Sequence, residues 1–441
     1  MNQKSEVAMD SLWKLSAARP LFDELEEDLK TNVLIIGGGI SGILCAYMLK
    51  QAGVDYALVE AERICSGTSG RTTAKITLQH GLIYDKLLKK YGENFTRGYL
   101  NANIEALEEY RKLCCNTECD YEACDAFVYS CDNREALERE ARAYEKLGYP
   151  AFITEDVPLP LKTVGAIGVR DQAQFNPMKL LFSLARELNI YEKTKVTELG
   201  RGKAIANGRE IRAKKIIVTT HFPILNKHGA YFLKLYQHRS YVIALEGARQ
   251  VGAMYVDEAK DGLSFRDSGD ILLLGGGSHR TGKRGGGWSE LEIFAKKHYT
   301  GATVVTKWAT QDCMSLDGVP YIGSYSRRTP DLLVATGYNK WGMTSAMVAA
   351  RLLCDAVCEK ENPYAEIFDP SRSILHRQLL VNVAESTLGL LTPTAPRCPH
   401  LGCALKYNQA EHSWDCSCHG SRFSEEGHLI DNPATDGMNK R

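Results

Sequence analysis

A glycine-rich turn near the amino terminus limits the folds that this chain can adopt. The apolar run Val33–Ile36 is followed directly by Gly37-Gly-Gly39-Ile-Ser-Gly42, and residues 43–51 have the apolar spacing of a helix. Residues 55–60 then read as a second strand that ends on Glu60. A strand, a turn, a helix and a second strand form the βαβ unit of a parallel sheet. We therefore predict a Rossmann-like domain.

The spacing Gly37-x-Gly39-x-x-Gly42 in this context is typical of dinucleotide binding. Gly37 allows the tight turn, Gly39 lets the backbone approach a pyrophosphate, and Gly42 lets the helix pack closely on the strand. The amino terminus of the helix stabilises the phosphate charge. Glu60 would accept a hydrogen bond from a ribose hydroxyl and would repel a 2′-phosphate. The motif therefore favours FAD or NAD over NADP.

The composition is that of a globular protein with several domains. The 441 residues include 54 basic and 54 acidic side chains, and this balance argues against a nucleic-acid partner. The chain has 14 cysteines and no secretory signal at its start, which predicts a reducing, cytoplasmic location. The uncharged run Thr31–Leu49 reaches membrane length, but it contains four glycines. We therefore expect no integral membrane segment.

Two boxes of cysteine and histidine near the carboxyl terminus have the residue types of a metal site. They are Cys398-Pro-His400-Leu-Gly-Cys403 and Cys416-Ser-Cys418-His419-Gly-Ser421. Two cysteines and two histidines could also form a tetrahedral zinc site. The spacing resembles more closely the Rieske [2Fe-2S] protein family, in which two thiolates hold one iron and two imidazoles hold the other.

The resemblance to Rieske proteins implies a role for the residues of both boxes. The cluster ligands would be Cys398, His400, Cys416 and His419. The remaining pair, Cys403 and Cys418, matches the disulfide that ties the two loops in high-potential members. The hydroxyl of Ser421 would bond a cluster sulfur.

The two cofactor motifs together favour FAD at the dinucleotide site. A Rieske cluster passes one electron at a time, whereas a nicotinamide gives up two electrons as a hydride. A flavin can do both, so it can connect a two-electron substrate to a one-electron centre. We therefore expect FAD and a Rieske-type [2Fe-2S] cluster as cofactors.

Further stretches extend the resemblance over about residues 8–360. The small-residue run 66–74 follows Arg63, and residues 317–323 and 335–344 form two more glycine-containing segments. In order and spacing they resemble the D-amino-acid oxidase-like flavoprotein superfamily, particularly the branch of glycine oxidase, sarcosine oxidase and γ-glutamylputrescine oxidoreductase. The whole chain is similar to a bacterial fusion of such an enzyme to a Rieske module. The resemblance implies FAD contacts from Gly37, Gly39, Gly42, Glu60, Arg63, Thr68, Ser69, Thr72, Val196, Gly337, Gly342, Met343 and Thr344.

The predicted fold class is α/β, or α+β for the chain overall. It combines a Rossmann-like FAD-binding domain, an inserted antiparallel-sheet substrate domain and a small all-β Rieske cluster-binding subdomain. The predicted boundaries are a leader (1–30), the FAD-binding domain (31–113, 177–222 and 313–362), the substrate domain (114–176 and 223–312), a linker (363–392) and the Rieske domain (393–441).

The resemblance implies oxidation of the C–N bond of an amine or amino acid by hydride transfer to flavin. The electrons would leave singly through the cluster to an unknown one-electron acceptor. Candidates for contact with the substrate are Arg239, Tyr241, Arg266, His279 and Lys340, with Arg239 or Arg266 as a carboxylate clamp. Two alternatives remain open. One is a dioxygen-using amine oxidase with a structural or regulatory cluster, and the other is a redox carrier or sensor without catalysis.

Five further cysteines lie close together in the sequence. Cys114, Cys115, Cys119, Cys124 and Cys131 fall within eighteen residues, but their spacing matches no iron-sulfur or zinc pattern. Cysteine is also a common small core residue. We interpret these five as free thiols.

Phe423 stands two residues after Ser421, where high-potential Rieske proteins have a tyrosine. One hydrogen bond to the cluster is therefore missing, and we expect a lower reduction potential than theirs. A Phe423→Tyr variant should raise the potential in a redox titration followed by the cluster's EPR signal. An unchanged potential would contradict the interpretation.

Overall fold

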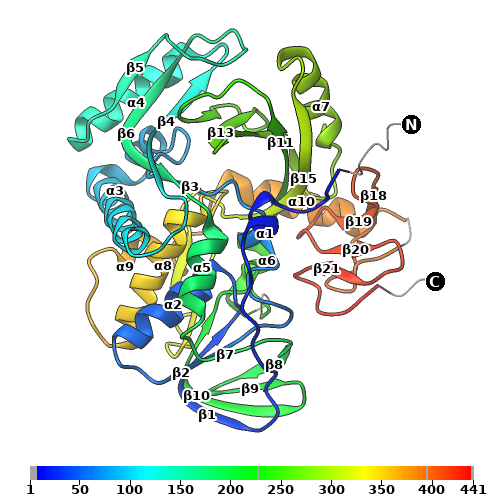
Figure 1. Cartoon of the computed structure of the whole chain (residues 1–441). Helices are drawn as coiled ribbons and strands as arrows, with labels where there is room; N and C mark the ends of the chain where they lie inside the picture. Colours follow the sequence, from blue (N-terminus) through cyan, green and yellow to red (C-terminus); the bar gives the residue numbers. More distant parts are fainter. Residues whose placement is uncertain (1–6, 226–227, 394–395, 439–441) are drawn as a thin grey trace.

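The computed structural model describes residues 7–225, 228–393 and 396–438. Residues 1–6, 394–395 and 439–441, which belong to the predicted leader and Rieske domain, lie outside the described residues, as do 226–227. Figure 1 shows two large sheets and one small sheet, and this architecture confirms the predicted fold class. Among the described helices, none has the length and apolar character needed to cross a membrane.

The glycine-rich turn follows a strand of an eight-stranded sheet, and the central strands of this sheet are parallel, as predicted. β1 (Leu29–Ile36) pairs in parallel with β2 (Tyr56–Val59) on one side and β10 (Arg209–Val218) on the other. The path through the sheet is β16-β17-β10-β1-β2-β7, and β8 and β9 extend it beside β10. These remaining strands are β7 (Ile190–Tyr191), β8 (Val196–Gly200), β9 (Lys203–Ala206), β16 (Tyr321–Ser324) and β17 (Leu332–Thr336).

Among the helices that share the main hydrophobic core with this sheet, three pack together. They are α2 (Ile40–Gln51), α5 (Pro177–Ala185) and α8 (Gly342–Val357). α2 lies so close to the preceding turn that a Cβ atom on Gly42 would sit 1.9 Å from the carbonyl oxygen of Gly37. Only glycine fits there, which is the packing role predicted for this residue. The uncharged run Thr31–Leu49 therefore folds as the end of β1, the turn and most of α2.

The second sheet has nine strands and is mainly antiparallel. Its path is β15-β11-β14-β13-β12-β4-β6-β3, with β5 paired to β6. The strands are β3 (Lys75–Ile76), β4 (Glu122–Ser130), β5 (Phe152–Thr154), β6 (Gly165–Gln174), β11 (Tyr236–Glu246), β12 (Met254–Asp257), β13 (Ser264–Ser268), β14 (Ile271–Arg280) and β15 (Thr303–Met314). Apart from β3 and the last residues of β15, they fall within the predicted substrate domain.

Helices α4 (Arg134–Leu147) and α7 (Gly287–His298) pack on these strands, and α3 (Tyr84–Cys115) packs against α4 and α8. The segment α3 consists of two helical parts that meet at a kink at Gly92. Gly92 adopts a φ of +79°, which glycine tolerates, and its non-helical backbone changes the direction of the chain between the two helical parts.

The carboxyl-terminal domain contains a four-stranded antiparallel sheet. Its strands are β18 (Leu405–Asn408), β19 (Ser413–Cys416), β20 (Arg422–Ser424) and β21 (Leu429–Asp431). Figure 1 shows this sheet in red beside α10 (Arg377–Leu391) and the edge strand β15. The shorter helices are α1 (Leu12–Ser16), α6 (Tyr231–Lys234) and α9 (Ala365–Phe368).

The described part of the predicted leader packs on the body of the protein. Trp13 of α1 is only 1% exposed, and its Nε1 donates a hydrogen bond to the carbonyl oxygen of Thr72 at 2.6 Å. Leu25 is also buried. Trp13 therefore supports the small-residue run that follows Arg63.

An ion pair fixes the predicted linker (363–392) to the predicted FAD-binding domain. The Nε and Nη2 atoms of Arg372 donate to the two carboxylate oxygens of Asp317 at 2.8 and 2.9 Å, and Tyr91 donates to the same carboxylate at 2.8 Å. Burial alone would raise the pKa of Asp317, but these partners lower it to about 2.

Replacing Arg372 by alanine should cost about 3 to 5 kcal/mol of unfolding free energy, because it leaves the Asp317 carboxylate buried without its cation. Urea unfolding measures this cost. Arg212→Ala is the control, since this arginine is 72% exposed in its ion pair and its loss should cost less than about 1 kcal/mol. Equal stability of the two variants would contradict the assignment.

The same pair predicts a pH dependence. Because the pKa of Asp317 is lowered on folding, its stabilisation is complete above its ordinary pKa of about 3.9 and is lost as the pH falls toward 2. The Arg372→Ala variant should lose less stability over that interval than the wild type.

Candidate active site and cluster-binding site

A cavity of about 760 Å³ is lined by both large sheets and by the carboxyl-terminal domain. Most of the residues predicted to contact FAD line it. These are Gly37, Gly39, Glu60, Arg63, Thr68, Ser69, Thr72, Val196, Gly337, Gly342 and Met343. The structure thus brings together residues that lie up to 306 positions apart in the sequence, from Gly37 to Met343.

The other two predicted contacts, Gly42 and Thr344, are not among the lining residues. Gly42 packs against the turn as described, and the hydroxyl of Thr344 lies 2.8 Å from Nε2 of His80 and donates to the carbonyl oxygen of Thr77 at 3.2 Å. Both residues therefore support the walls of the cavity from behind.

Two helices begin at this cavity. Gly39 and Gly342 line it at the amino termini of α2 and α8, and neither N-cap residue, Gly39 or Trp341, makes a side-chain cap hydrogen bond, although the N–H of Ile40 donates to Oγ of Ser69 at 2.9 Å. Uncapped backbone N–H groups at a helix amino terminus stabilise negative charge. The residues present therefore fit a dinucleotide with an anionic pyrophosphate.

Glu60 lies at the end of β2, as the fingerprint requires. Its carboxylate accepts hydrogen bonds from the backbone N–H groups of Gly38 at 2.6 Å and Glu62 at 3.0 Å. Burial raises the pKa of Glu60, and these two donors act against that rise. Arg63 is held nearby by the buried Glu192, with a contact of 2.6 Å between Nη1 and Oε2.

Arg266 does not face the cavity. Its guanidinium donates to the backbone carbonyl oxygens of Thr73 and Ala74, both at 2.8 Å, and packs over the ring of Trp13. Because these partners use the guanidinium, the structure corrects the prediction that Arg266 clamps a substrate carboxylate.

Arg239 is also used elsewhere. Its Nε donates to Oε1 of Glu411 at 3.0 Å and its Nη2 contacts Oε2 of the same carboxylate, which belongs to the cluster domain. Neither Arg239 nor His279 is among the residues that line the cavity. Tyr241 lines it, but the hydroxyl of Tyr241 donates to Glu411 at 3.0 Å. The clamp role of Arg239 is therefore corrected as well.

Lys340 is the predicted substrate residue that remains available. It lines the cavity beside Asp312, which the sequence analysis missed. Burial lowers the pKa of Lys340 and raises the pKa of Asp312 to about 6, and each charge opposes the shift of the other. Asn339 and Lys340 have φ values of +53° and +73°, a strained backbone of the kind that clusters at functional sites.

His221 is a second cavity residue that sequence reasoning missed. It has a φ of +63°, and its Nε2 atom is buried with no hydrogen-bond partner among the described residues. Nothing in the local sequence distinguishes it from an ordinary core histidine.

The four predicted cluster ligands lie together in the carboxyl-terminal domain. The ring centroids of His400 and His419 are 4.9 Å apart, and the buried thiol of Cys398 is close enough to that of Cys416 for the neighbouring thiol to raise the pKa of Cys398. His419 is 2% exposed and its Nδ1 has no hydrogen-bond partner within the described chain. A buried, unpartnered imidazole nitrogen beside two buried thiols fits a [2Fe-2S] cluster with mixed ligands.

The predicted disulfide partners lie at the same place. The Sγ atoms of Cys403, Cys416 and Cys418 are within 4.8 Å of one another, and all three are free thiols in the structure. The Cys403–Cys418 disulfide therefore stays a prediction, as does the choice of Cys398 and Cys416 as the ligand pair.

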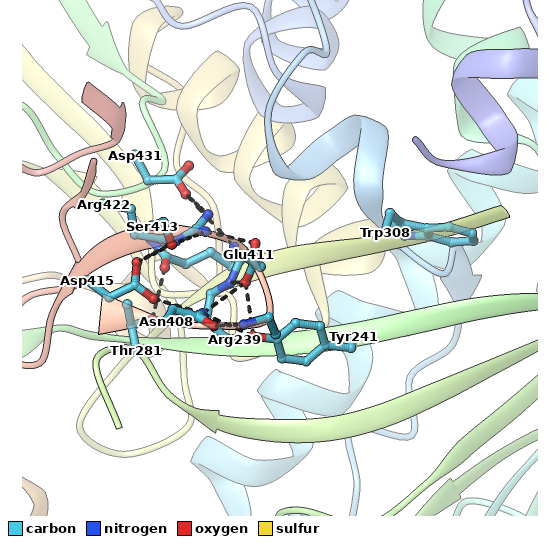
Figure 2. A network of polar contacts seen from close by, with 12 residues as sticks. Arg239, Tyr241, Thr281, Trp308, Asn408, Glu411, Ser413, Asp415, Arg422 and Asp431 are labelled. Atoms are coloured by element: carbon cyan, nitrogen blue, oxygen red, sulfur yellow. Dashed lines mark hydrogen bonds and ion pairs between the residues drawn. The ribbon is translucent and has the colours of Figure 1, made fainter. Parts of the chain in front are cut away.

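An ionic network fastens the cluster domain to the substrate-domain sheet (Figure 2). Glu411 lies between Arg239 of β11 and Arg422 of β20, which donates to Glu411 at 2.8 Å. Arg422 also pairs with Asp415 at 3.1 Å and Asp431 at 3.0 Å. Burial would raise the pKa of Glu411, but Arg239 and Arg422 hold it below its ordinary value.

Along β11 and β15, residues that line the cavity alternate with residues that bond the cluster domain, although Tyr241 contributes to both sites and Cys313 also lines the cavity. Ser240 and Val242 of β11 line the cavity, while Gln237 and Arg239 bond the cluster domain. In the neighbouring β15, Thr310 and Asp312 line the cavity, while Nε2 of Gln311 donates to the carbonyl oxygen of Gly420 at 2.9 Å.

Successive side chains of a strand point to opposite faces. The backbone carbonyl of Gln311 accepts a hydrogen bond from Thr68, a predicted FAD contact, at 2.9 Å. One layer of sheet therefore separates the dinucleotide cavity from the loop that contains His419 and Gly420, which we call the cluster loop.

Comparison with known proteins identifies two families in this chain. The FAD dependent oxidoreductase family matches residues 32–356, and the Rieske [2Fe-2S] domain matches residues 370–440. A Bacillus subtilis protein named as a Rieske 2Fe-2S iron-sulfur protein, YhfW, is 33% identical over 97% of this chain and 96% of its own length.

Two further relatives cover mainly the flavoprotein part. Gamma-glutamylputrescine oxidoreductase of Escherichia coli is 24% identical over 80% of this chain and 89% of its own length. The structure of glycine oxidase from Geobacillus kaustophilus aligns with a TM-score of 0.66 at 18% identity, covering 78% of this chain and all of that one. This likeness shows a shared fold.

A Glu411→Gln variant tests the docking network. It should cost about 3 kcal/mol or more, because Arg239 and Arg422 lose the carboxylate that compensates their buried charge. We expect faster amide hydrogen exchange in β18 to β21, measured by mass spectrometry. Glu425→Gln is the control, because this side chain is 50% exposed and pairs only at the surface. Equal exchange rates in both variants would argue against the network.

Proposed function

Because the chain belongs to the FAD dependent oxidoreductase family and carries a Rieske [2Fe-2S] domain, we propose that it oxidises the C–N bond of an amine or amino acid. The substrate gives up a hydride and a proton and becomes an imine, which water then hydrolyses. The two electrons leave one at a time, through the cluster domain, to a one-electron acceptor.

The arrangement of the two sites carries this proposal. FAD, when bound, supplies a two-electron acceptor that can also give up single electrons, and the cluster accepts one electron at a time. Gln311 connects the two sites, because its backbone binds Thr68 and its side chain binds the loop that contains His419 and Gly420. A purely structural cluster would not need this position.

Lys340 and Asp312 support an amino acid as the substrate. They place a cation and a carboxylate at the same wall of the cavity, and an amino acid carries the complementary pair of charges. The names of the glycine oxidase and gamma-glutamylputrescine oxidoreductase relatives are consistent with this substrate class. We propose that Lys340 binds the substrate carboxylate.

We propose a cytoplasmic location for this reaction. Ten of the 14 cysteines lie outside the two cluster boxes and are interpreted as free thiols, which persist in a reducing compartment.

The reaction is tested by adding single amines and amino acids to the anaerobic holoenzyme. The right substrate should bleach the flavin absorbance and then produce the EPR signal of a reduced Rieske cluster. Reoxidation should be faster with an artificial one-electron acceptor than with dioxygen. Bleaching without a cluster signal would contradict the electron route, and rapid reoxidation by dioxygen alone would favour the oxidase.

A Lys340→Met variant tests the substrate contact. It should lower kcat/KM for an amino acid about 10- to 100-fold, the effect of losing one charged hydrogen bond. The decarboxylated amine is the internal control, because it has no carboxylate and its kcat/KM should not change. Lys340→Arg should restore part of the loss. Equal effects on both substrates would contradict the assignment.

A further inference from the structure

A short segment of the cluster domain lines the cavity predicted to hold FAD. Residues 429–435 comprise β21 and the four residues that follow it, and all of them except Pro433 are among the lining residues. The matched FAD dependent oxidoreductase family ends at residue 356, far before this segment. The cavity is therefore built from both parts of the chain.

Asn432 ties this segment to the wall next to the phosphate-binding turn. Its Nδ2 donates to the backbone carbonyl oxygens of Thr220 and Phe222, both at 2.8 Å. Thr220 directly follows Thr219, and a Cβ atom on Gly37 would lie 2.8 Å from the carbonyl oxygen of Thr219. Asn432 is thus fastened beside the first glycine of the dinucleotide fingerprint.

Thr435 ties the same segment to the wall near Val196. The Nζ atom of Lys195 donates to the carbonyl oxygen of Thr435 at 2.8 Å. Lys195 and Val196 both line the cavity. The segment therefore crosses one end of the cavity, from the phosphate-binding turn to the strand that carries Val196.

Gln237 joins this segment to the cluster loop. Its Nε2 donates to the carbonyl oxygen of Asn432 at 2.8 Å and to the carbonyl oxygen of His419 at 3.1 Å. One buried side chain thus holds both the wall of the cavity and a predicted cluster ligand. The segment and the cluster loop are positioned together.

We propose that residues 429–435 are part of the FAD-binding site and that they close its dinucleotide end. In this arrangement FAD leaves the protein only when the segment moves away from Thr220 and Lys195. The cluster domain then has a second role besides electron transfer, which is to retain the flavin. The inference needs FAD binding but no particular substrate, so it is independent of C–N oxidation.

The rate of FAD release from the full-length holoenzyme tests this inference. After rapid dilution, released FAD is measured by its fluorescence, and the visible circular dichroism of the cluster is recorded in the same sample. Asn432→Ala removes two hydrogen bonds of the closing segment and should speed FAD release about tenfold. Lys195→Met removes the anchor of Thr435 and should speed it several-fold.

The matched control is Asn362→Ala. Asn362 also makes a side-chain hydrogen bond, from Nδ2 to Asp355 at 2.7 Å, and it is not among the cavity residues. This variant should release FAD at the wild-type rate. Glu411→Gln, which weakens the docking of the cluster domain and reaches residues 429–435 only through the arginines that also pair with Asp431, should release FAD faster than the wild type.

Wild-type release rates in both Asn432→Ala and Lys195→Met, with the cluster spectrum intact, would overturn the inference. Faster release that occurs only in samples without the cluster spectrum would reflect loss of the domain's fold and would overturn it too. Because no amine is added, neither result bears on the proposed oxidation.

Discussion

One buried carboxylate between two guanidinium groups determines how the two parts of this protein meet. Glu411 belongs to the cluster domain, Arg239 to the substrate-domain sheet and Arg422 to the centre of the cluster domain. Taking three charges out of water is costly, so the arrangement is stable only with close and complementary contacts. These close contacts form in only one relative placement of the two domains, and in any other placement the charges would be buried without their partners. Both the position of the cluster loop behind the cavity wall and the position of residues 429–435 depend on that placement.

The cofactor motifs could be predicted from the sequence because cofactor binding requires particular residues at short spacing. A tight turn beside a pyrophosphate needs Gly37 and Gly39 whatever the rest of the fold does. Cluster ligands likewise have to lie close together in two loops, so His400 and His419 stand out in the sequence. The central strands and helices were also predictable, because their apolar patterns are strong and local.

The substrate residues could not be predicted in the same way. Arg239 and Arg266 have the right chemistry for a clamp, but the sequence does not show which partners reach them first. Glu411 is 172 positions from Arg239, and the carbonyl oxygens that hold Arg266 are 192 and 193 positions away from it. Asp312 was missed for the opposite reason, since a single acidic residue in a strand looks like any exposed charge. Only the tertiary contacts show that Arg239 and Arg266 are used elsewhere and that Asp312 lines the cavity.

The order of side chains along β11 matters for two sites, because residues of this strand contact both the cluster domain and the cavity. Gln237 and Arg239 serve the joint between the domains, whereas Ser240 and Val242 serve the cavity. In a strand, inserting or deleting one residue exchanges the two faces along the rest of its length. Such a change in β11 would turn a docking arginine toward the flavin and a cavity residue toward the cluster. Mutations in β11 therefore affect both sites at once. A cluster domain taken from a related protein would dock here only if its contact residues matched the side chains of this strand.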